Sequence, residues 1–187
     1  MTVDSPDAID QALVAAFLAA HDEASFRAIY ARHSPLLYGL ALRLCGGRRA
    51  EADDVLQETW IRAIARLAEF RWASALSSWL CGICVRCARE LGRATQPREA
   101  ALPETPAGRD GAGDAGLDLD RAIARLPSGY REVLVLHDVY GYTHSEVAGL
   151  LEIDQGTSKS QLARARRAAR AMLGAGSPLE RGKESVR

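Results

Sequence analysis

The sequence has few aromatic residues, no net charge and no long apolar run, and each absence argues against a class of protein. Aromatic residues make up 6% of its 187 residues, and no stretch alternates polar and apolar positions long enough to demand a β-sheet. Its 24 basic and 24 acidic residues cancel, which argues against a histone-like protein that binds nucleic acid by overall charge alone. No segment approaches the roughly 20 apolar residues that a membrane span needs. Since Ala, Leu, Arg and Glu dominate, helix is the default interpretation.

The apolar run at residues 12–20 has the length of a signal-peptide core but the wrong charge before it. Asp4, Asp7 and Asp10 stand where a signal peptide carries positive residues. We therefore predict an amphipathic first helix over residues 10–20, in a cytoplasmic protein with no membrane insertion.

Cysteine is also scarce, and three of the four cysteines form the pattern C-x-x-C-x-x-C at Cys81, Cys84 and Cys87. This pattern invites an iron–sulfur or zinc interpretation, but the residues that follow Cys87 offer no fourth ligand. On a helix the third thiol is turned about 120° away from the first, as expected of small residues packed between helices. We favour packing and predict neither a cofactor nor a metal. A cysteine-based redox or metal sensor stays open as an alternative.

Residues 142–172 have the pattern of a helix-turn-helix, with two helical segments joined by a three- or four-residue turn. Asp154 is placed to cap the second segment, which carries five basic residues and no acidic one. At 3.6 residues per turn, its apolar residues share one face while Arg164 and Arg167 lie on the opposite face. One such helix fits the major groove of B-DNA, where its N-terminal residues meet base edges and its basic residues neutralise phosphates. A basic helix that is merely solvated is the alternative.

A second charged surface is predicted on a helix over residues 50–70. Acidic residues in its first turns complement the helix dipole, which explains Asp53 and Asp54 but not Glu58. Asp54 and Glu58 are like charges at i and i+4, a mildly destabilising arrangement on an exposed helix. With Gln57 beside them, they favour a surface that binds a basic partner, and a solvated acidic face is the alternative.

Aromatic and basic residues interleave at a predicted loop-to-helix junction over residues 70–93, where Ser77 or Ser78 is expected to cap the helix. In sites for single-stranded nucleic acid, aromatic rings stack on bases and arginines follow phosphates. A buried tryptophan with solvent-facing arginines is the alternative, and the residues alone favour it. The residues of this junction are Arg71, Trp72, Trp79, Arg86 and Arg89.

Composition divides the chain into two small helical domains, residues 1–95 and 119–173, with the helix-turn-helix in the second. Residues 96–118 are rich in Pro and Gly and hold almost no large apolar residue, which predicts a flexible linker. The tail, residues 174–187, shows no periodicity and is predicted to be disordered. The predicted fold class is therefore all-α, with two domains joined by a linker.

Local signals place the helix ends within these domains. Asp22 can cap a second helix, which the pair at residues 34–35 interrupts because proline cannot donate to the helical ladder. The Gly-Gly pair at residues 46–47 stops the following segment. In the second domain, apolar segments over residues 119–126 and 130–138 precede the helix-turn-helix.

Two blocks of sequence together resemble the extracytoplasmic-function class of bacterial sigma factors: DVLQETWIRAI in the first domain and ARLPSGYREVLVLHDVYGYTHSEVAGLLEIDQGTSKSQLARARRA in the second. The resemblance covers roughly residues 10–173, and the second block is the more specific because it preserves residue types and spacing together. It implies two all-helical domains on a linker and no catalytic activity. It further implies an alternative sigma factor that binds core RNA polymerase and directs promoter-specific transcription initiation.

The resemblance also implies a role for each surface. The acidic residues of the helix over residues 50–70 match the part that binds the β′ coiled coil of core polymerase. The junction over residues 70–93 matches the part that melts and captures the −10 promoter element, so stacking becomes the favoured role of its aromatic residues. An anti-sigma factor is a further partner that the family admits. The helix that reads the −35 element is matched by Gln155, Thr157, Lys159, Ser160, Gln161 and Arg164, with Arg167 on the same face.

The sequence departs from the family pattern at four places. Ser158 stands on the packing face where the family usually has Val, so its hydroxyl must find a partner. Glu152 occupies the turn position where Gly is common, and a positive φ there is strained. Gln161 stands where the family often has a basic residue, which alters one DNA contact. Residues 75–78 lack the usual Phe-Arg pair, which changes the site for the captured −10 base.

A stand-alone helix-turn-helix transcription regulator is the alternative function from another class. Such a protein reads paired half-sites as a dimer, and the sequence shows no heptad seam that would form one.

Overall fold

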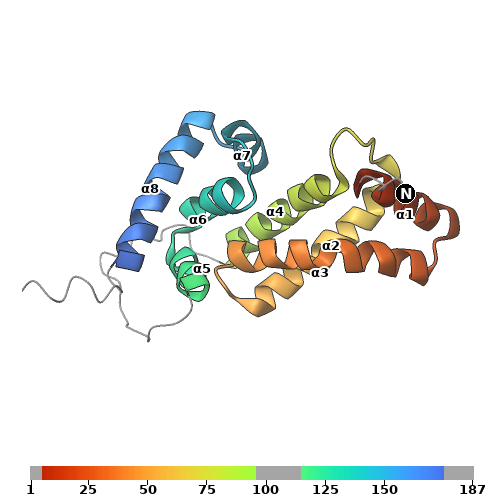
Figure 1. The fold of residues 1–187 in the computed structure, drawn as a ribbon, viewed down its shortest axis with the longest axis horizontal. Helices are drawn as coiled ribbons and strands as arrows, with labels where there is room; N and C mark the ends of the chain where they lie inside the picture. The colour runs from red at the N-terminus through yellow and green to blue at the C-terminus, as the bar shows by residue number, and fades with distance from the viewer. Residues whose placement is uncertain (1–5, 96–114, 175–187) are drawn as a thin grey trace, which may run out of the picture. The chain divides into compact units, whose positions relative to one another are not determined.

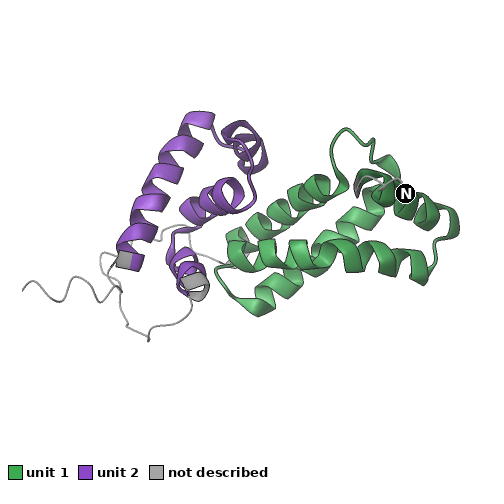
Figure 2. Ribbon diagram, viewed as in Figure 1, with its two compact units in different colours: residues 1–95 green, residues 96–187 purple. Residues whose placement is uncertain are grey.

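The computed structural model describes residues 6–95 and 115–174, which belong to two compact units (Figure 2). Unit 1 comprises residues 1–95 and unit 2 comprises residues 96–187. Every regular element within the described ranges is a helix, which confirms the all-α prediction for them. Most of the predicted linker and tail lies outside the described residues. None of the described helices has the length and hydropathy that crossing a bilayer requires.

Unit 1 packs its helices around one apolar core (Figure 1). Its helices in the described range are α1 (Pro6–Ala20), α2 (Glu23–Leu44), α3 (Arg49–Arg66) and α4 (Leu76–Thr95), with a 3-10 turn, Leu67–Glu69, after α3. α2 contacts the other three helices, and α3 contacts α4. The core contains the fully buried side chains of Leu37, Leu40, Val55 and Leu80. This packing leaves one face of α3 open to solvent.

α2 continues through Pro35, so the interruption predicted there is wrong. The helix runs without a break for 22 residues. Its buried positions recur every three or four residues on both sides of the proline, which keeps one stripe in the core. The hydroxyl of Ser34 also accepts a hydrogen bond from Trp60 Nε1 at 3.0 Å. A proline inside a helix costs about 3 kcal/mol, and burial of the continuous stripe offsets this loss.

Both ends of α2 lie where the sequence predicts them. Asp22 caps the helix, since its Oδ1 accepts the N–H of Ser25 at 2.8 Å. At the other end, Gly46 and Gly47 adopt φ angles of 64° and 80°. The N–H of Gly47 returns to the carbonyl of Leu42 at 2.8 Å. Glycine adopts this left-handed conformation without strain, so the pair stops the helix.

α4 begins at Leu76, so the prediction that Ser77 or Ser78 caps it is wrong. Ala75 precedes the helix, and its carbonyl accepts the N–H of Trp79 at 3.2 Å. Leu76 is completely buried. Its packing in the core, rather than a side-chain cap, sets the start of the helix, and the two serines lie inside the first turn.

Unit 2 places one long helix against shorter ones (Figure 1). Its described elements are α5 (Ala115–Arg125), α6 (Ser128–Leu134), the π-helical segment Val135–Val139 that continues α6, α7 (His144–Leu151) and α8 (Gln155–Gly174). α8 contacts α5, α6 and α7. α5 begins inside the range that the sequence assigned to the linker, because the apolar pattern that marks the helix starts only at Leu119.

α7 and α8 form the helix-turn-helix, and the three residues between them form the turn. Thr143 opens α7 with a capping box: its hydroxyl accepts the N–H of Glu146 at 3.3 Å, while its own N–H donates to the Glu146 carboxylate at 2.8 Å. Glu152, the first turn residue, adopts a φ of 53°. Glu152 thus has the left-handed backbone for which glycine is common at this position, and a residue with a Cβ atom is strained there.

Arg131 is a buried cation that stabilises the junction between α5 and α6. It is 5% exposed, and its Nη1 donates to the carbonyls of Ala124 and Leu126 at 3.0 and 3.3 Å. We expect Arg131→Met to lower the free energy of unfolding of unit 2 by about 2–3 kcal/mol, because buried carbonyls lose their donor. Urea unfolding of the full chain measures the loss. Arg121→Met, which removes an exposed arginine from α5, is the matched control, and equal stability of the two variants would contradict this role.

Candidate nucleic-acid and polymerase interfaces

α8 separates a buried face from an exposed one. Ser158, Leu162, Ala165 and Ala169 are each at most 5% exposed and pack within unit 2. The opposite positions are exposed and form what we call the outer face of α8: Gln155, Lys159, Ser160, Arg164 and Arg167, with Thr157 half-buried at its edge. Polar and cationic side chains on one exposed helix face have the chemistry to contact base edges and phosphates.

Gln161 lies apart from the other predicted −35 residues. It is half-buried, and its Nε2 atom would lie 3.5 Å from a Cβ atom added to Gly129, the second residue of α6. The structure thus places its amide beside α6, whereas the residues of the outer face project away from unit 2.

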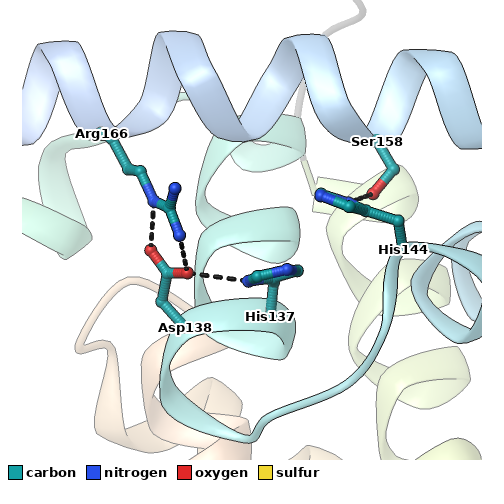
Figure 3. Close-up of polar contacts among 5 residues, drawn as sticks. All are labelled: His137, Asp138, His144, Ser158 and Arg166. Atoms are coloured by element: carbon teal, nitrogen blue, oxygen red, sulfur yellow. Dashed lines mark hydrogen bonds and ion pairs between the residues drawn. The ribbon is translucent and has the colours of Figure 1, made fainter.

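Arg166 turns back onto its own unit, unlike the basic residues of the outer face (Figure 3). Its Nε donates to Asp138 Oδ2 at 2.8 Å and its Nη2 donates to Asp138 Oδ1 at 2.6 Å. The hydrogen bonds from Arg166 hold the pKa of Asp138 below its ordinary value. Arg166 is one of the five basic residues that the sequence places on this helix. Its partner Asp138 lies 28 residues away, so no local pattern in the sequence predicts the pair.

The hydroxyl of Ser158 has the partner that its burial requires (Figure 3). Ser158 is fully buried on the packing face of α8, as the sequence predicts. Its Oγ forms a hydrogen bond with Nδ1 of His144, the first residue of α7, at 3.0 Å. The two helices of the helix-turn-helix are therefore joined by a polar contact where an apolar one would be usual.

The predicted acidic surface lies on the outer side of α3. Asp53, Asp54 and Gln57 are exposed. Glu58 is different, because Arg62 Nε donates to its carboxylate at 2.6 Å and Arg62 Nη2 also reaches Glu90 of α4 at 2.7 Å. Arg62 thus offsets the unfavourable i, i+4 pair of acids that the sequence identified, and Glu58 also belongs to the contact between α3 and α4.

Two apolar residues that the sequence analysis missed extend this surface. Ile61 and Ile64 are 55% and 41% exposed. With Asp54 and Gln57 they follow an i, i+3, i+7, i+10 spacing, so the four lie on one face of α3, which we call the α3 stripe. Large exposed aliphatic residues beside acids are typical of a protein-binding surface. The available signal was their spacing, which places both isoleucines off the buried face of the helix.

The aromatic residues of the predicted −10 site form one cluster before and at the start of α4. The ring of Phe70 has its centroid 4.9 Å from those of both Trp72 and Trp79. Trp72 adopts a φ of 56°, an unusual conformation for a bulky residue. Both tryptophans are half-buried, so part of each ring stays open to solvent. Phe70 is the member of this cluster to which the sequence analysis gave no role.

The three predicted arginines of this region differ in exposure. Arg71 and Arg86 are exposed and Arg89 is half-buried. Trp79 and Arg86 stand seven residues apart on α4, which places them on the same face two turns apart. One half-buried aromatic ring and one exposed cation thus share a side of α4.

The four cysteines lie in the core of unit 1. Each is at most 4% exposed, and none forms a disulfide bond. Burial raises the pKa of Cys84 and of Cys87, which opposes thiolate formation. Cys84 Sγ lies 3.7 Å from the carbonyl of Leu37 on α2. Among the described residues, no three His, Cys, Asp or Glu side chains gather where they could hold a metal ion. Burial at helix contacts supports the packing interpretation.

We expect these thiols to be unreactive in the folded chain. A disulfide reagent such as DTNB should label them at least about a hundredfold more slowly in buffer than in urea, because burial shields all four thiols from the reagent. Counting labelled thiols by absorbance against time measures this. A cysteine that reacts in the native chain as fast as in the unfolded one would contradict the packing role and favour a redox sensor.

Comparison with known proteins places this geometry in a family. Residues 29–97 match the family Sigma-70 region 2, and residues 116–168 match Sigma-70, region 4. The chain is 36% identical over 168 residues to the ECF RNA polymerase sigma factor SigM of Mycobacterium tuberculosis, covering 86% of this chain and 84% of that protein. The chain is an extracytoplasmic-function sigma factor. It is therefore an alternative sigma factor that directs promoter-specific transcription initiation, as the resemblance implied, and its family consists of regulatory proteins.

Other relatives agree with this assignment. The sigma factor is 30% identical over 146 residues to EcfG of Rhodopseudomonas palustris, covering 74% of this chain and 80% of the relative. Among solved structures, it is similar to CnrH in complex with the cytosolic domain of CnrY, with a TM-score of 0.61 and 27% identity over 92% of this chain and all of CnrH. It is also similar to RpoE of Bartonella quintana, solved with the anti-sigma factor NepR, with a TM-score of 0.59 and 26% identity over 81% of this chain and 98% of that one.

Proposed function

We propose that this sigma factor divides its task between its two units. Unit 1 binds core RNA polymerase at the β′ coiled coil and captures the opened −10 element. Unit 2 binds the −35 element. Both tasks are binding tasks, so the chain needs no catalytic group or cofactor, and it works in the cytoplasm with the polymerase.

Polymerase binding is assigned to the α3 stripe with Asp53 and Glu58 at its edge. An interface needs desolvated anchors as well as charge, and the two exposed isoleucines provide the anchors. The acids beside them complement a basic partner and speed its association.

Capture of the −10 element is assigned to the aromatic cluster of Phe70, Trp72 and Trp79. Each base that stacks on an aromatic side chain contributes about 1–3 kcal/mol. Arg71 and Arg86 are exposed close to the cluster in sequence or on the same helix face, where they can follow the backbone of the strand. The left-handed conformation of Trp72 supports a functional role, because such strain persists where function requires it.

Recognition of the −35 element is assigned to the outer face of α8. Its first residues, Gln155, Thr157 and Ser160, are polar and suited to base edges, while Lys159, Arg164 and Arg167 are suited to phosphates or guanine. Gln161 is a predicted contact that would have to leave its place beside α6 to reach a base.

An anti-sigma factor is a further proposed partner. Two of the similar solved structures are complexes of sigma factors with such inhibitors or with a cytosolic partner domain. The α3 stripe is an exposed apolar surface that an inhibitor could cover.

The observation that carries the proposal is the presence, in one chain, of an apolar and acidic stripe on α3 and a cationic outer face on α8. A stand-alone helix-turn-helix regulator would use the second but leave the first without a task. The test is run-off transcription of fragmented genomic DNA by core polymerase, with and without the purified chain. We expect discrete transcripts that depend on the chain; the absence of such transcripts and of co-elution with core polymerase would contradict the proposal.

A further inference from the structure

α8 is held to unit 2 by two polar anchors, Ser158 on its buried face and Arg166 on an exposed flank that turns back onto the unit (Figure 3). Asp138 binds Arg166 through two hydrogen bonds, and His144 binds Ser158 through one. Ser158 and Arg166 stand eight residues apart, which is about 12 Å along the axis of an α-helix. Two points this far apart restrain both the tilt of α8 and its rotation about its own axis.

The two anchors are also joined to each other. His137 Nδ1 lies 2.8 Å from Asp138 Oδ1, on the oxygen that also accepts Arg166 Nη2. The rings of His137 and His144 stack with centroids 4.4 Å apart and an interplanar angle of 33°. His137 and Asp138 both lie in the π-helical segment, whose widened turn directs neighbouring side chains differently from an α-helix. One connected cluster, which we call the relay, thus reaches α8 at both anchor points.

The relay stands where apolar packing provides little restraint on rotation. The described buried face of α8 consists of Ser158, Leu162, Ala165 and Ala169, of which only Leu162 is large. Alanines allow close approach, but they offer no large side chain that interlocks with a neighbouring helix. Directional hydrogen bonds to charged groups restrain geometry where smooth packing does not.

The proposal rests on the assignment of α8 to promoter recognition. We propose that Asp138 and His144 are positioning residues for promoter recognition, which set the rotation of α8 and so the alignment of its outer face with base edges. Arg166 then acts by holding Asp138 and not by contacting phosphate.

The charges around the relay fit this role. Asp138 is ionised and pairs with Arg166 and His137, while Lys159 of α8 is the other cation that acts on His144. Desolvation lowers the pKa of His144, and the positive charges of Lys159 and Arg166 lower it further. Its ring is therefore neutral at pH 7 and can hold the Ser158 hydroxyl without adding charge.

A positioning role and a phosphate contact predict different effects of a substitution on DNA binding. A base contact fails when the helix rotates slightly, whereas a phosphate contact tolerates the change, so loss of positioning lowers the ratio of specific to non-specific affinity. Loss of a phosphate contact instead weakens binding to all DNA and lowers the salt dependence of the binding constant by about one charge.

The test uses the full chain assembled with core polymerase and a duplex that wild-type holoenzyme selects from a randomised pool. Asp138→Asn and Arg166→Ala should each lower the affinity ratio for selected over scrambled duplex by about fivefold, the factor that corresponds to a well-formed ion pair. The double variant should lose no more than either single one. The salt dependence should stay that of wild type, whereas Arg167→Ala, which removes an exposed cation of the outer face, should lower it by about one.

Matched variants separate positioning from charge and from folding. Asp118→Asn makes the same charge change in an exposed ion pair of α5 and should keep the wild-type ratio. His144→Ala should lower the ratio, and His144→Asn, which keeps a hydrogen-bonding atom near the Ser158 hydroxyl, should restore it. Hydrogen exchange of peptides from α8 checks that each variant is folded.

Two results would overturn this inference but leave the assignment of α8 to promoter recognition intact. One is a wild-type ratio for Asp138→Asn. The other is a loss of salt dependence in Arg166→Ala equal to that in Arg167→Ala, which would make Arg166 a phosphate contact. If wild-type holoenzyme selects no duplex at all, the assignment of α8 to promoter recognition fails, and the inference fails with it.

Discussion

Replacing Lys159 and Arg164 together by alanine should lower transcription from a cognate promoter by about a hundredfold or more. Both side chains are exposed on the outer face of α8, and neither belongs to the buried face of the helix. A specific base contact contributes about 1–3 kcal/mol, so each substitution alone should weaken promoter use by roughly tenfold. Run-off transcription with saturating core polymerase measures the effect.

The control for this prediction is Arg121→Ala, which removes an exposed arginine of unit 2 that lies on α5. It should transcribe like wild type. The double variant should also retain its affinity for core polymerase, since the surface assigned to that task lies in unit 1. Undiminished transcription by a folded Lys159→Ala, Arg164→Ala chain would show that α8 does not read the promoter.

The pair Asp54→Arg and Ile61→Asp should abolish binding to core polymerase. Both positions lie on the α3 stripe, where Asp54 contributes charge and Ile61, 55% exposed, contributes the largest exposed apolar surface. Residues at the centre of an interface typically contribute about 2 kcal/mol or more, so the pair should weaken binding by about a thousandfold. Competition with a labelled wild-type chain for core polymerase measures the loss.

Ile61 is a sharper choice for this experiment than Glu58. Glu58 pairs with Arg62, which also bonds Glu90 of α4, so a charge reversal there would disturb the packing of unit 1 as well as its surface. Glu23→Arg makes the same kind of charge change at an exposed position at the start of α2 and serves as the control. If the variant of Asp54 and Ile61 binds as tightly as wild type while Glu23→Arg does too, the α3 stripe is not the polymerase-binding surface.

Helix positions were predictable where a local signal decides them. Asp22 begins α2 by accepting a hydrogen bond from the N–H of Ser25, three residues later. Gly46 and Gly47 end the same helix by their backbone conformation. The prediction failed at Pro35, where the local loss is real but a buried stripe on both sides of it keeps the helix intact. Tertiary packing overrides local preference here, because the stripe packs against α1, α3 and α4, which lie elsewhere in the sequence.

The candidate surfaces were predictable by residue type, but their partners were not. Charge and spacing identify Lys159, Arg164 and Asp54 as exposed positions. No local pattern reveals that Arg166 is held by Asp138, because 28 residues separate them. The exposure of Ile61 similarly depends on which face of α3 the rest of unit 1 covers.

Site-directed DNA cleavage by a probe tethered to each unit tests the central claim most directly. Gly156→Cys places the tether at the start of α8, where an added Cβ meets no atom within 4 Å, and Ser78→Cys places it on an exposed residue at the start of α4. The four native cysteines are buried and should stay unlabelled. In holoenzyme on a cognate promoter, the probe on α8 should cut around the −35 element and the probe on α4 around the −10 element. Cleavage of neither element, or of the same element by both probes, would contradict the division of promoter recognition between the two units.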